Sequence, residues 1–106
     1  MKINFNQNLK KIDGTPLMEQ KVEGGQIIDT QKPITLKDVC TAVLMQNDDK
    51  IDGKEKYERF KLAMAIQEGK GDVELNIEGA AKIIELIGKV HAPLIYGQCY
   101  EILNQI

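Results

Sequence analysis

Apolar residues recur at helical spacing from Ile34 onwards, and this pattern limits the possible folds of the chain more than any other feature. One apolar stripe runs through "LKDVCTAVL", and Thr35 before it makes a capping-box pattern with Asp38 three residues later. Three similar segments follow, each opened by a capping residue or by a proline suited to the first helical turn. The sequence therefore predicts four helices, at about 36–46, 53–68, 77–90 and 93–104, with the short extended segment "DVEL" before the third.

The first third of the chain lacks this helical pattern. "KINFN" alternates Ile3 and Phe5 with polar residues, as a half-buried strand does, and Asp13-Gly14 predicts a tight turn, so we predict a short hairpin. Residues 18–33 have neither period, and their glycine pair indicates an extended or flexible connection. A segment with so few large apolar residues has no core of its own. It lies on the helical part, lies on another chain or stays mobile.

Together these patterns predict a mainly α fold, a small bundle of about four helices with an N-terminal β-hairpin or extended arm. The expected organisation is an arm at residues 1–33 and a helical domain at residues 34–106. A chain of 106 residues is most economically one domain. Gly88 and Gly97 fall inside predicted helices, where each costs up to ~1 kcal/mol relative to alanine, and close approach of another helix is the structural reason to keep them.

Composition argues against several classes of function. The formal charge is −2, from 14 basic and 16 acidic residues, and the basic residues are interleaved with acids, so we expect no direct binding of nucleic acid. Arg59 is the one arginine, and no tryptophan is present to stack on bases. No apolar run approaches the ~20 residues that cross a bilayer, and the N-terminus has no secretory signal. We expect a cytoplasmic protein in which Cys40 and Cys99 are buried free thiols, with a disulfide as the alternative.

The stretch "NDDKIDGKEKYE", residues 47–58, most resembles a functional motif. As a calcium-binding loop that starts at Asp48, it has a carboxylate at the fifth position and a glycine at the sixth. The same register puts Lys50 and Arg59 at ligand positions, which disfavours calcium binding. The preferred interpretation is a joint between two helices, in which Asp52 and Glu55 form the capping box of the second helix.

No combination of side chains predicts a catalytic, cofactor or metal site. The chain has no serine, and neither cysteine is close in sequence to the one histidine, His91. One histidine and two distant cysteines do not have the spacing of a zinc site, and no glycine-rich segment has the context of a phosphate-binding loop. We therefore expect a non-enzymatic protein without a cofactor, and a nucleophilic Cys40 or Cys99 paired with His91 is a disfavoured alternative.

The tyrosines are expected at the edge of the core, with a role as interface anchors as the alternative. Tyr57 belongs to the side of the second helix that we expect to face inward, together with Phe60, Ala63, Met64 and Ile66 or Gln67. Tyr96 and Tyr100 are four residues apart and share one face of the last helix. If that face is exposed, it becomes the leading candidate for a contact surface.

Several segments together resemble a known group of proteins. The strings "IDGTPL", "ITLKDVCTAVL", "GKEKYERFKLA", "VELN" and "IGKVHAPLIYGQCYEIL", in that order, are similar to a family of small uncharacterised proteins encoded by tailed bacteriophages and prophages. The resemblance spans most of the chain, except for residues 18–33. The family has no assigned activity or functional residues. The resemblance therefore implies only a phage context, as a virion or assembly accessory or as a small factor that acts on the host.

We expect this protein to act by contact with other proteins, first as a virion or assembly accessory. Its partner is then a viral or host protein or a second copy of the chain, in the cytoplasm of the bacterial host or in the virion. The alternative is an inhibitor of a host enzyme or defence complex, with an acidic face that occupies a nucleic-acid groove. The candidate contact residues are apolar residues of the arm, two acids of the 47–58 stretch and the last tyrosine pair: Ile3, Phe5, Leu9, Ile12, Asp48, Asp49, Tyr96 and Tyr100.

Overall fold

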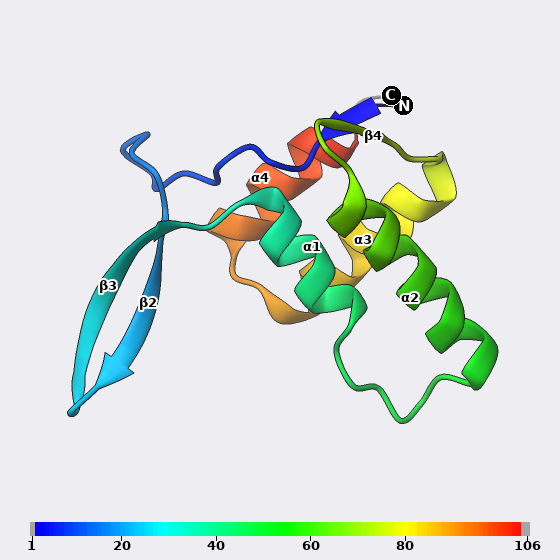
Figure 1. Cartoon of the computed structure of the whole chain (residues 1–106), viewed down its shortest axis with the longest axis horizontal. Coiled ribbons are helices and arrows are strands. Elements are labelled where there is room, and N and C mark those ends of the chain that lie inside the picture. The colour runs from blue at the N-terminus through cyan, green and yellow to red at the C-terminus, as the bar shows by residue number, and fades with distance from the viewer. Residues whose placement is uncertain (1, 105–106) are drawn as a thin grey trace.

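The structure, a computed structural model, describes the backbone of residues 2–104 and the side chains within that range other than those of residues 21–22 and 28–31. The outermost residues of the predicted arm and helical domain, 1 and 105–106, lie outside the described part. The described chain is a small, mainly helical molecule with two short antiparallel sheets (Figure 1). In chain order its elements are β1 (Lys2–Asn4), β2 (Met18–Glu23), β3 (Gln26–Pro33), α1 (Leu36–Leu44), α2 (Gly53–Glu68), β4 (Asp72–Glu74), α3 (Ile77–Val90) and α4 (Pro93–Leu103).

The helices begin where the sequence predicts. Thr35 caps α1 with a complete capping box, in which the Thr35 side chain accepts from the N–H of Asp38 and the Asp38 carboxylate accepts from the N–H of Thr35 (3.0 Å). Asp52 caps α2 and Asn76 caps α3, each through one side-chain oxygen. Pro93 occupies the first turn of α4. Local capping chemistry therefore accounts for where each helix starts.

One hydrophobic core holds the helices together. α1 packs on both α2 and α3, and α3 also packs on α4. Removal of these apolar side chains from water is the main stabilising contribution, worth roughly 25 cal/mol per Å² of apolar surface. The largest fully buried side chains come from the N-terminal segment as well as from all four helices: Phe5, Leu9, Leu36, Cys40, Ile66, Ile83, Ile87, Cys99 and Leu103.

β1 forms from the alternating segment that the sequence identifies, but its partner differs from the predicted one. It pairs antiparallel with β4, and Ile3 lies opposite Val73. In Figure 1, β1 and β4 lie side by side near the N-terminus. The predicted hairpin on β1 is therefore corrected, because a strand about seventy residues further along the chain satisfies the backbone of β1.

The predicted turn at Asp13-Gly14 is present, although little strand structure flanks it. Gly14 has a φ of 89°, and its N–H donates to the carbonyl oxygen of Lys11 (3.0 Å). The Asp13 carboxylate accepts from both the N–H and the hydroxyl of Thr15. These bonds lower the pKa of the Asp13 carboxyl below its usual value. Beside this turn, within the described residues, strand pairing is limited to one isolated bridge between Lys10 and Pro16.

A hairpin of two longer strands, with one shift of register between Met18 and Gln20, lies instead at residues 18–33, where the sequence pattern predicts a connection. β2 and β3 pair antiparallel, and Glu23 lies opposite Gln26 across the turn. Gly24 and Gly25 have positive φ angles of 59° and 80°. Positive φ at both central residues is the signature of the type I′ turn, whose twist suits a two-residue hairpin. In Figure 1 the hairpin extends away from the helices, at the opposite end of the molecule from α2.

The residues before the hairpin belong to the helical body. Ile3, Phe5 and Leu9 are buried in the same core as the helices. Residues 2–17 therefore contact the helical part, whereas the three placements left open from the sequence concern the following segment, residues 18–33. A boundary at residue 33 does not separate two cores, because these side chains on its N-terminal side complete the core on its C-terminal side.

Candidate protein-binding surfaces

Residues 47–58 cover most of the joint between α1 and α2 and the first turns of α2, as the sequence predicts. The Asp52 carboxylate accepts from the N–H of Glu55 (2.9 Å) and so caps α2. The Asp48 carboxylate accepts from the N–H of Lys50 (3.0 Å) in the preceding turn. These acids thus bond to the backbone of the joint. Within residues 2–104, no group of three or more His, Cys, Asp or Glu side chains is placed to hold a metal ion.

The predicted capping box of Asp52 and Glu55 is only half formed, because the Glu55 carboxylate bonds to another helix instead of the Asp52 N–H. The carboxylate bonds to the ammonium group of Lys82 on α3, with Oε2 2.9 Å from Nζ. Oε1 of Glu55 also lies 3.9 Å from Nε of Arg59, and Nη1 of Arg59 lies 3.8 Å from Oδ2 of Asp48. The Arg59 side chain is 11% exposed. This chain of ion pairs connects the joint, α2 and α3 in a partly buried setting.

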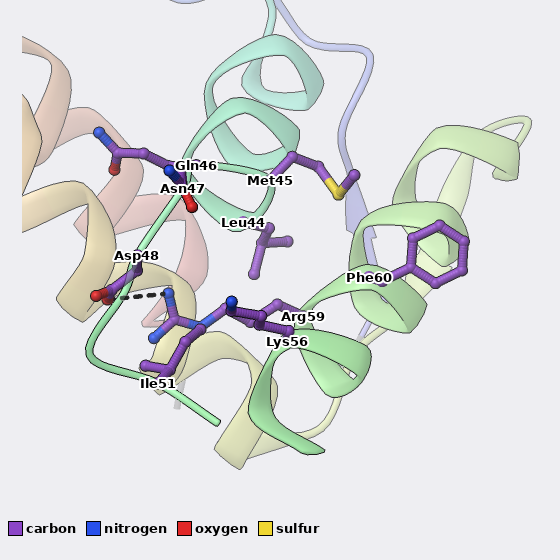
Figure 2. Close-up of a pocket in the computed structure, with 9 residues that line it drawn as sticks. All are labelled: Leu44, Met45, Gln46, Asn47, Asp48, Ile51, Lys56, Arg59 and Phe60. Atoms are coloured by element: carbon purple, nitrogen blue, oxygen red, sulfur yellow. Dashed lines mark ion pairs between the residues drawn. The ribbon is translucent and has the colours of Figure 1, made fainter. Parts of the chain in front are cut away.

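A pocket of about 260 Å³ lies between the end of α1 and the first half of α2. Figure 2 shows Asp48 and Arg59 turned toward each other on one side of it, and Met45 and Phe60 on the other side. Its lining contains no serine, cysteine or histidine, and its one acid is paired with Arg59. The lining offers packing surface and no free acid–base pair. It consists of Leu44, Met45, Gln46, Asn47, Asp48, Ile51, Lys56, Arg59 and Phe60.

The side chains with nucleophilic chemistry lie elsewhere. Cys40 and Cys99 are free and fully buried, as predicted. Burial raises the pKa of the Cys99 thiol to about 11, and burial, with a smaller contribution from Cys99, raises the pKa of Cys40 as well. Both thiols are therefore protonated, and weakly nucleophilic, at neutral pH. His91 stands at the C-cap of α3, where its backbone N–H donates to the carbonyl oxygen of Ile87 (2.9 Å).

Three of the four arm residues expected to contact a partner belong to this chain's own core. Ile3 is 2% exposed, Phe5 1% and Leu9 0%, so none of them is accessible on the folded protein. The expectation is corrected for these three because the pairing of β1 with β4 brings their segment onto the helices. Ile12, beside the turn at residues 13–14, is 93% exposed and remains accessible to a partner.

The other candidate contact residues are accessible to different degrees. Asp49 is exposed, whereas Asp48 is partly buried and paired with Arg59. Tyr96 packs against the core, while Tyr100 is 44% exposed, and their ring centroids are 6.0 Å apart. The acids lie in the joint before α2 and the tyrosines lie on α4, so the two pairs belong to different parts of the chain.

α2 carries an exposed apolar stripe that the sequence pattern placed inward. Tyr57, Phe60 and Met64 are 60%, 44% and 38% exposed, and we call these three residues the outward face of α2. The rings of Tyr57 and Phe60 stack with their centroids 6.4 Å apart. Nζ of Lys61 lies 5.0 Å from the centre of the Tyr57 ring. The expectation of an inward position is therefore wrong for Tyr57, Phe60 and Met64, whereas it is confirmed for Ala63 and Ile66, which are buried.

The side of α2 that does face the core carries charged residues. The apolar pattern of the helix alone therefore does not predict its orientation. Ala63 and Ile66 are buried there, and the largely buried Arg59 and partly buried Glu55 lie on the same side. The ion pair between Glu55 and Lys82 satisfies the carboxylate, so this side tolerates burial despite its charges. The sequence pattern placed Ala63 and Ile66 inward correctly, but it added the larger Tyr57, Phe60 and Met64 to the same side.

The β2–β3 hairpin is the second surface without a covering element. Within the described residues, the sheet order places β2 and β3 beside each other and beside no third strand. Alternate backbone groups on the two outer edges therefore point away from the partner strand. Ile27, next to the turn, is 69% exposed.

No protein-family model, curated protein or solved structure matches this chain. No helix in the described range is long and apolar enough to cross a lipid bilayer. The functional interpretation therefore rests on the geometry of two surfaces, the β2–β3 hairpin and the outward face of α2.

Proposed function

We propose that this chain is a non-enzymatic, phage-type protein that binds another protein, as a virion or assembly accessory factor. The observation that carries the proposal is the β2–β3 hairpin, a two-stranded sheet that extends away from the helices (Figure 1). The resemblance to small proteins of tailed bacteriophages and prophages supplies the context. In that context the protein acts in the cytoplasm of the bacterial host or as a part of the virion.

A two-stranded sheet of this kind is better explained by binding than by the stability of the helical body. An isolated hairpin is at best marginally stable in water, and each outer edge is a template for another strand. One strand from a partner protein satisfies the backbone groups along an edge and enlarges the sheet. Among the described side chains, none from residues 18–33 belongs to the hydrophobic core or packs against it.

Substitutions in the hairpin turn test this proposal without touching the core. An added Cβ meets no atom within 4 Å at Gly24 or Gly25, so a valine there acts only through the positive φ that the turn requires. We expect Gly24→Val combined with Gly25→Val to abolish co-purification with the partner from infected or prophage-induced cells, as read by mass spectrometry.

The control is Gly97→Ala on α4, where an added Cβ also meets no atom within 4 Å and φ is not positive. This variant should retain the partner, and both variants should keep the helical circular dichroism of the parent. An unchanged set of partners in the double-valine variant would rule out the hairpin as the binding element.

A host-directed inhibitor is the second candidate, and it rests on the exposed Asp49 beside the partly exposed Asp48. Carboxylates on such a surface imitate nucleic-acid phosphates and occupy a basic groove. Asp48→Asn combined with Asp49→Asn should then remove a salt-sensitive association with a host enzyme. Recovery of the protein from purified virions at stoichiometric copy number would argue against this candidate and for the accessory factor.

A further inference from the structure

The outward face of α2 is apolar along one stripe. Tyr57, Phe60 and Met64 stand at positions i, i+3 and i+7, so they follow one another along the same side of the helix. Each is a large side chain that is more than a third exposed. Aromatic and methionine side chains gathered in this way are typical of a protein contact surface.

Charged residues along one edge of this stripe change sign from end to end. Lys54, Lys61 and Glu68 follow one another at intervals of seven residues, so they lie along the same edge. Lys54 and Glu68, near the two ends of α2, are both exposed. Lys61, between them, has its ammonium group over the Tyr57 ring. The edge is therefore positive near the start of the helix and negative at its end.

We propose that the outward face of α2 binds the same face of a second copy of this chain, with the two α2 helices antiparallel. In that arrangement, Lys54 of each copy faces Glu68 of the other, and the symmetry of the contact produces this pair twice. The same alignment places Tyr57 beside Met64 of the other copy, where the thioether contacts an aromatic ring. The helix dipoles also oppose each other favourably.

The same charged residues make a parallel alignment of the two α2 helices less favourable. In a parallel pair of α2 helices, Lys54 faces Lys54 and Glu68 faces Glu68, so both ends repel. An antiparallel pair brings the two Lys61 residues near the symmetry axis, where the contact with the Tyr57 ring draws each ammonium group away from the other. A second copy in the antiparallel direction thus matches both the apolar stripe and the order of charges.

This self-association goes beyond the binding role proposed for the hairpin. The hairpin lies at the opposite end of the molecule from α2 (Figure 1), so a dimer formed through α2 leaves both hairpins free. Two linked hairpins bind a repetitive partner more tightly than one, because the second contact becomes intramolecular. The two proposals are separable, since the double-valine hairpin variant should still dimerise.

Sedimentation equilibrium of the purified full chain tests the dimer, in a dilution series whose upper end is about 1 mM. We expect the parent to show a monomer–dimer equilibrium. Lys54→Glu and Glu68→Lys should each weaken dimerisation about 10-fold, because each reversal puts like charges at both symmetric contacts. The combined variant, Lys54→Glu with Glu68→Lys, should return to within about 3-fold of the parent, because the pairs are then restored with their signs exchanged.

Replacement of the apolar residues of this face by aspartate tests the dimer independently of the charge reversals. Phe60→Asp and, separately, Met64→Asp should weaken dimerisation by about 100-fold or more, because each places a charge in the middle of the contact. Tyr100→Asp on α4 is the matched control, since Tyr100 and Phe60 are both 44% exposed, and it should leave the dimer unchanged. A parent that is monomeric throughout the series, or a double charge reversal that fails to restore dimerisation, would overturn the proposal.

Discussion

Leu9 shows how the first residues of the chain stabilise the helices. Its N–H donates to the carbonyl oxygen of Ile34 (2.8 Å), its carbonyl oxygen accepts from the N–H of Leu17 (2.9 Å), and its side chain is fully buried. We expect Leu9→Ala to lower the free energy of unfolding by about 2–5 kcal/mol, from lost burial and the cavity that remains. Ile12→Ala, at a site 93% exposed, should change it by less than about 0.5 kcal/mol. Urea denaturation followed by circular dichroism measures both, and equal effects would contradict the assignment of Leu9 to the core.

The burial of the two thiols predicts that the folded protein loses stability at alkaline pH. In the folded chain the pKa of Cys99 is about 11, raised by burial from an ordinary value of 9.0, so between these pH values the unfolded chain has lost a proton that the folded chain retains. The unfolded state then binds fewer protons, and stability falls as pH rises. Each such thiol contributes about 1.4 kcal/mol per pH unit to this loss. The raised pKa of Cys40 acts with the same sign.

Cys99→Ala isolates this effect from the titration of lysines and tyrosines. The difference in unfolding free energy between the parent and Cys99→Ala should be constant below about pH 8.5 and should shrink above it. Urea denaturation in the presence of a reducing agent measures this difference at each pH. A difference that does not change up to pH 11 would contradict the burial of a protonated thiol at this position.

At the scale of elements, the two glycines inside α3 and α4 differ in their surroundings. A Cβ added at Gly88 would lie 3.3 Å from Cε2 of Tyr96, whereas one added at Gly97 meets no atom within 4 Å. The predicted close approach is therefore confirmed at Gly88 and wrong at Gly97. We expect Gly97→Ala to stabilise the protein by about 0.5–1 kcal/mol, because alanine favours the helix. Gly88→Ala should gain less, since Tyr96 must move, and equal gains in thermal denaturation would contradict this contact.

The helices were predictable from the sequence because their signals are local. Thr35, Asp52, Asn76 and Pro93 act within one turn of the residues that they cap, so a pattern read along the chain identifies them. The strands were harder. β1 depends on β4, far away in the sequence, and no local pattern states that pairing. The turn of the β2–β3 hairpin did carry a local signal, a glycine pair suited to two positive φ angles, but its flanking strands lack the alternation that usually accompanies it.

At the scale of the whole molecule, the candidate surfaces depend on which side of each element faces the core. The apolar pattern of α2 fits two sides, and the ion pair of Glu55 with Lys82 favours the side that carries smaller apolar residues inward. Phe5 and Leu9 are likewise core residues, in a segment that follows β1 and its pairing with the distant β4. Tertiary contacts of this kind cannot be read from one element at a time. Of the eight candidate contact residues predicted from the sequence, three are buried, Ile3, Phe5 and Leu9. The binding role itself stays a prediction.

The most direct test of the proposed binding role is photo-crosslinking from the hairpin in infected or prophage-induced cells. Ile27 beside the hairpin turn is 69% exposed, and Ile77 at the start of α3, 62% exposed, is the matched control. A benzophenone amino acid at position 27 should give a discrete adduct with another protein, and the same group at position 77 should give none. The adduct should disappear when Gly24→Val and Gly25→Val are added. No adduct from position 27, or equal adducts from both positions, would contradict a hairpin that binds a partner.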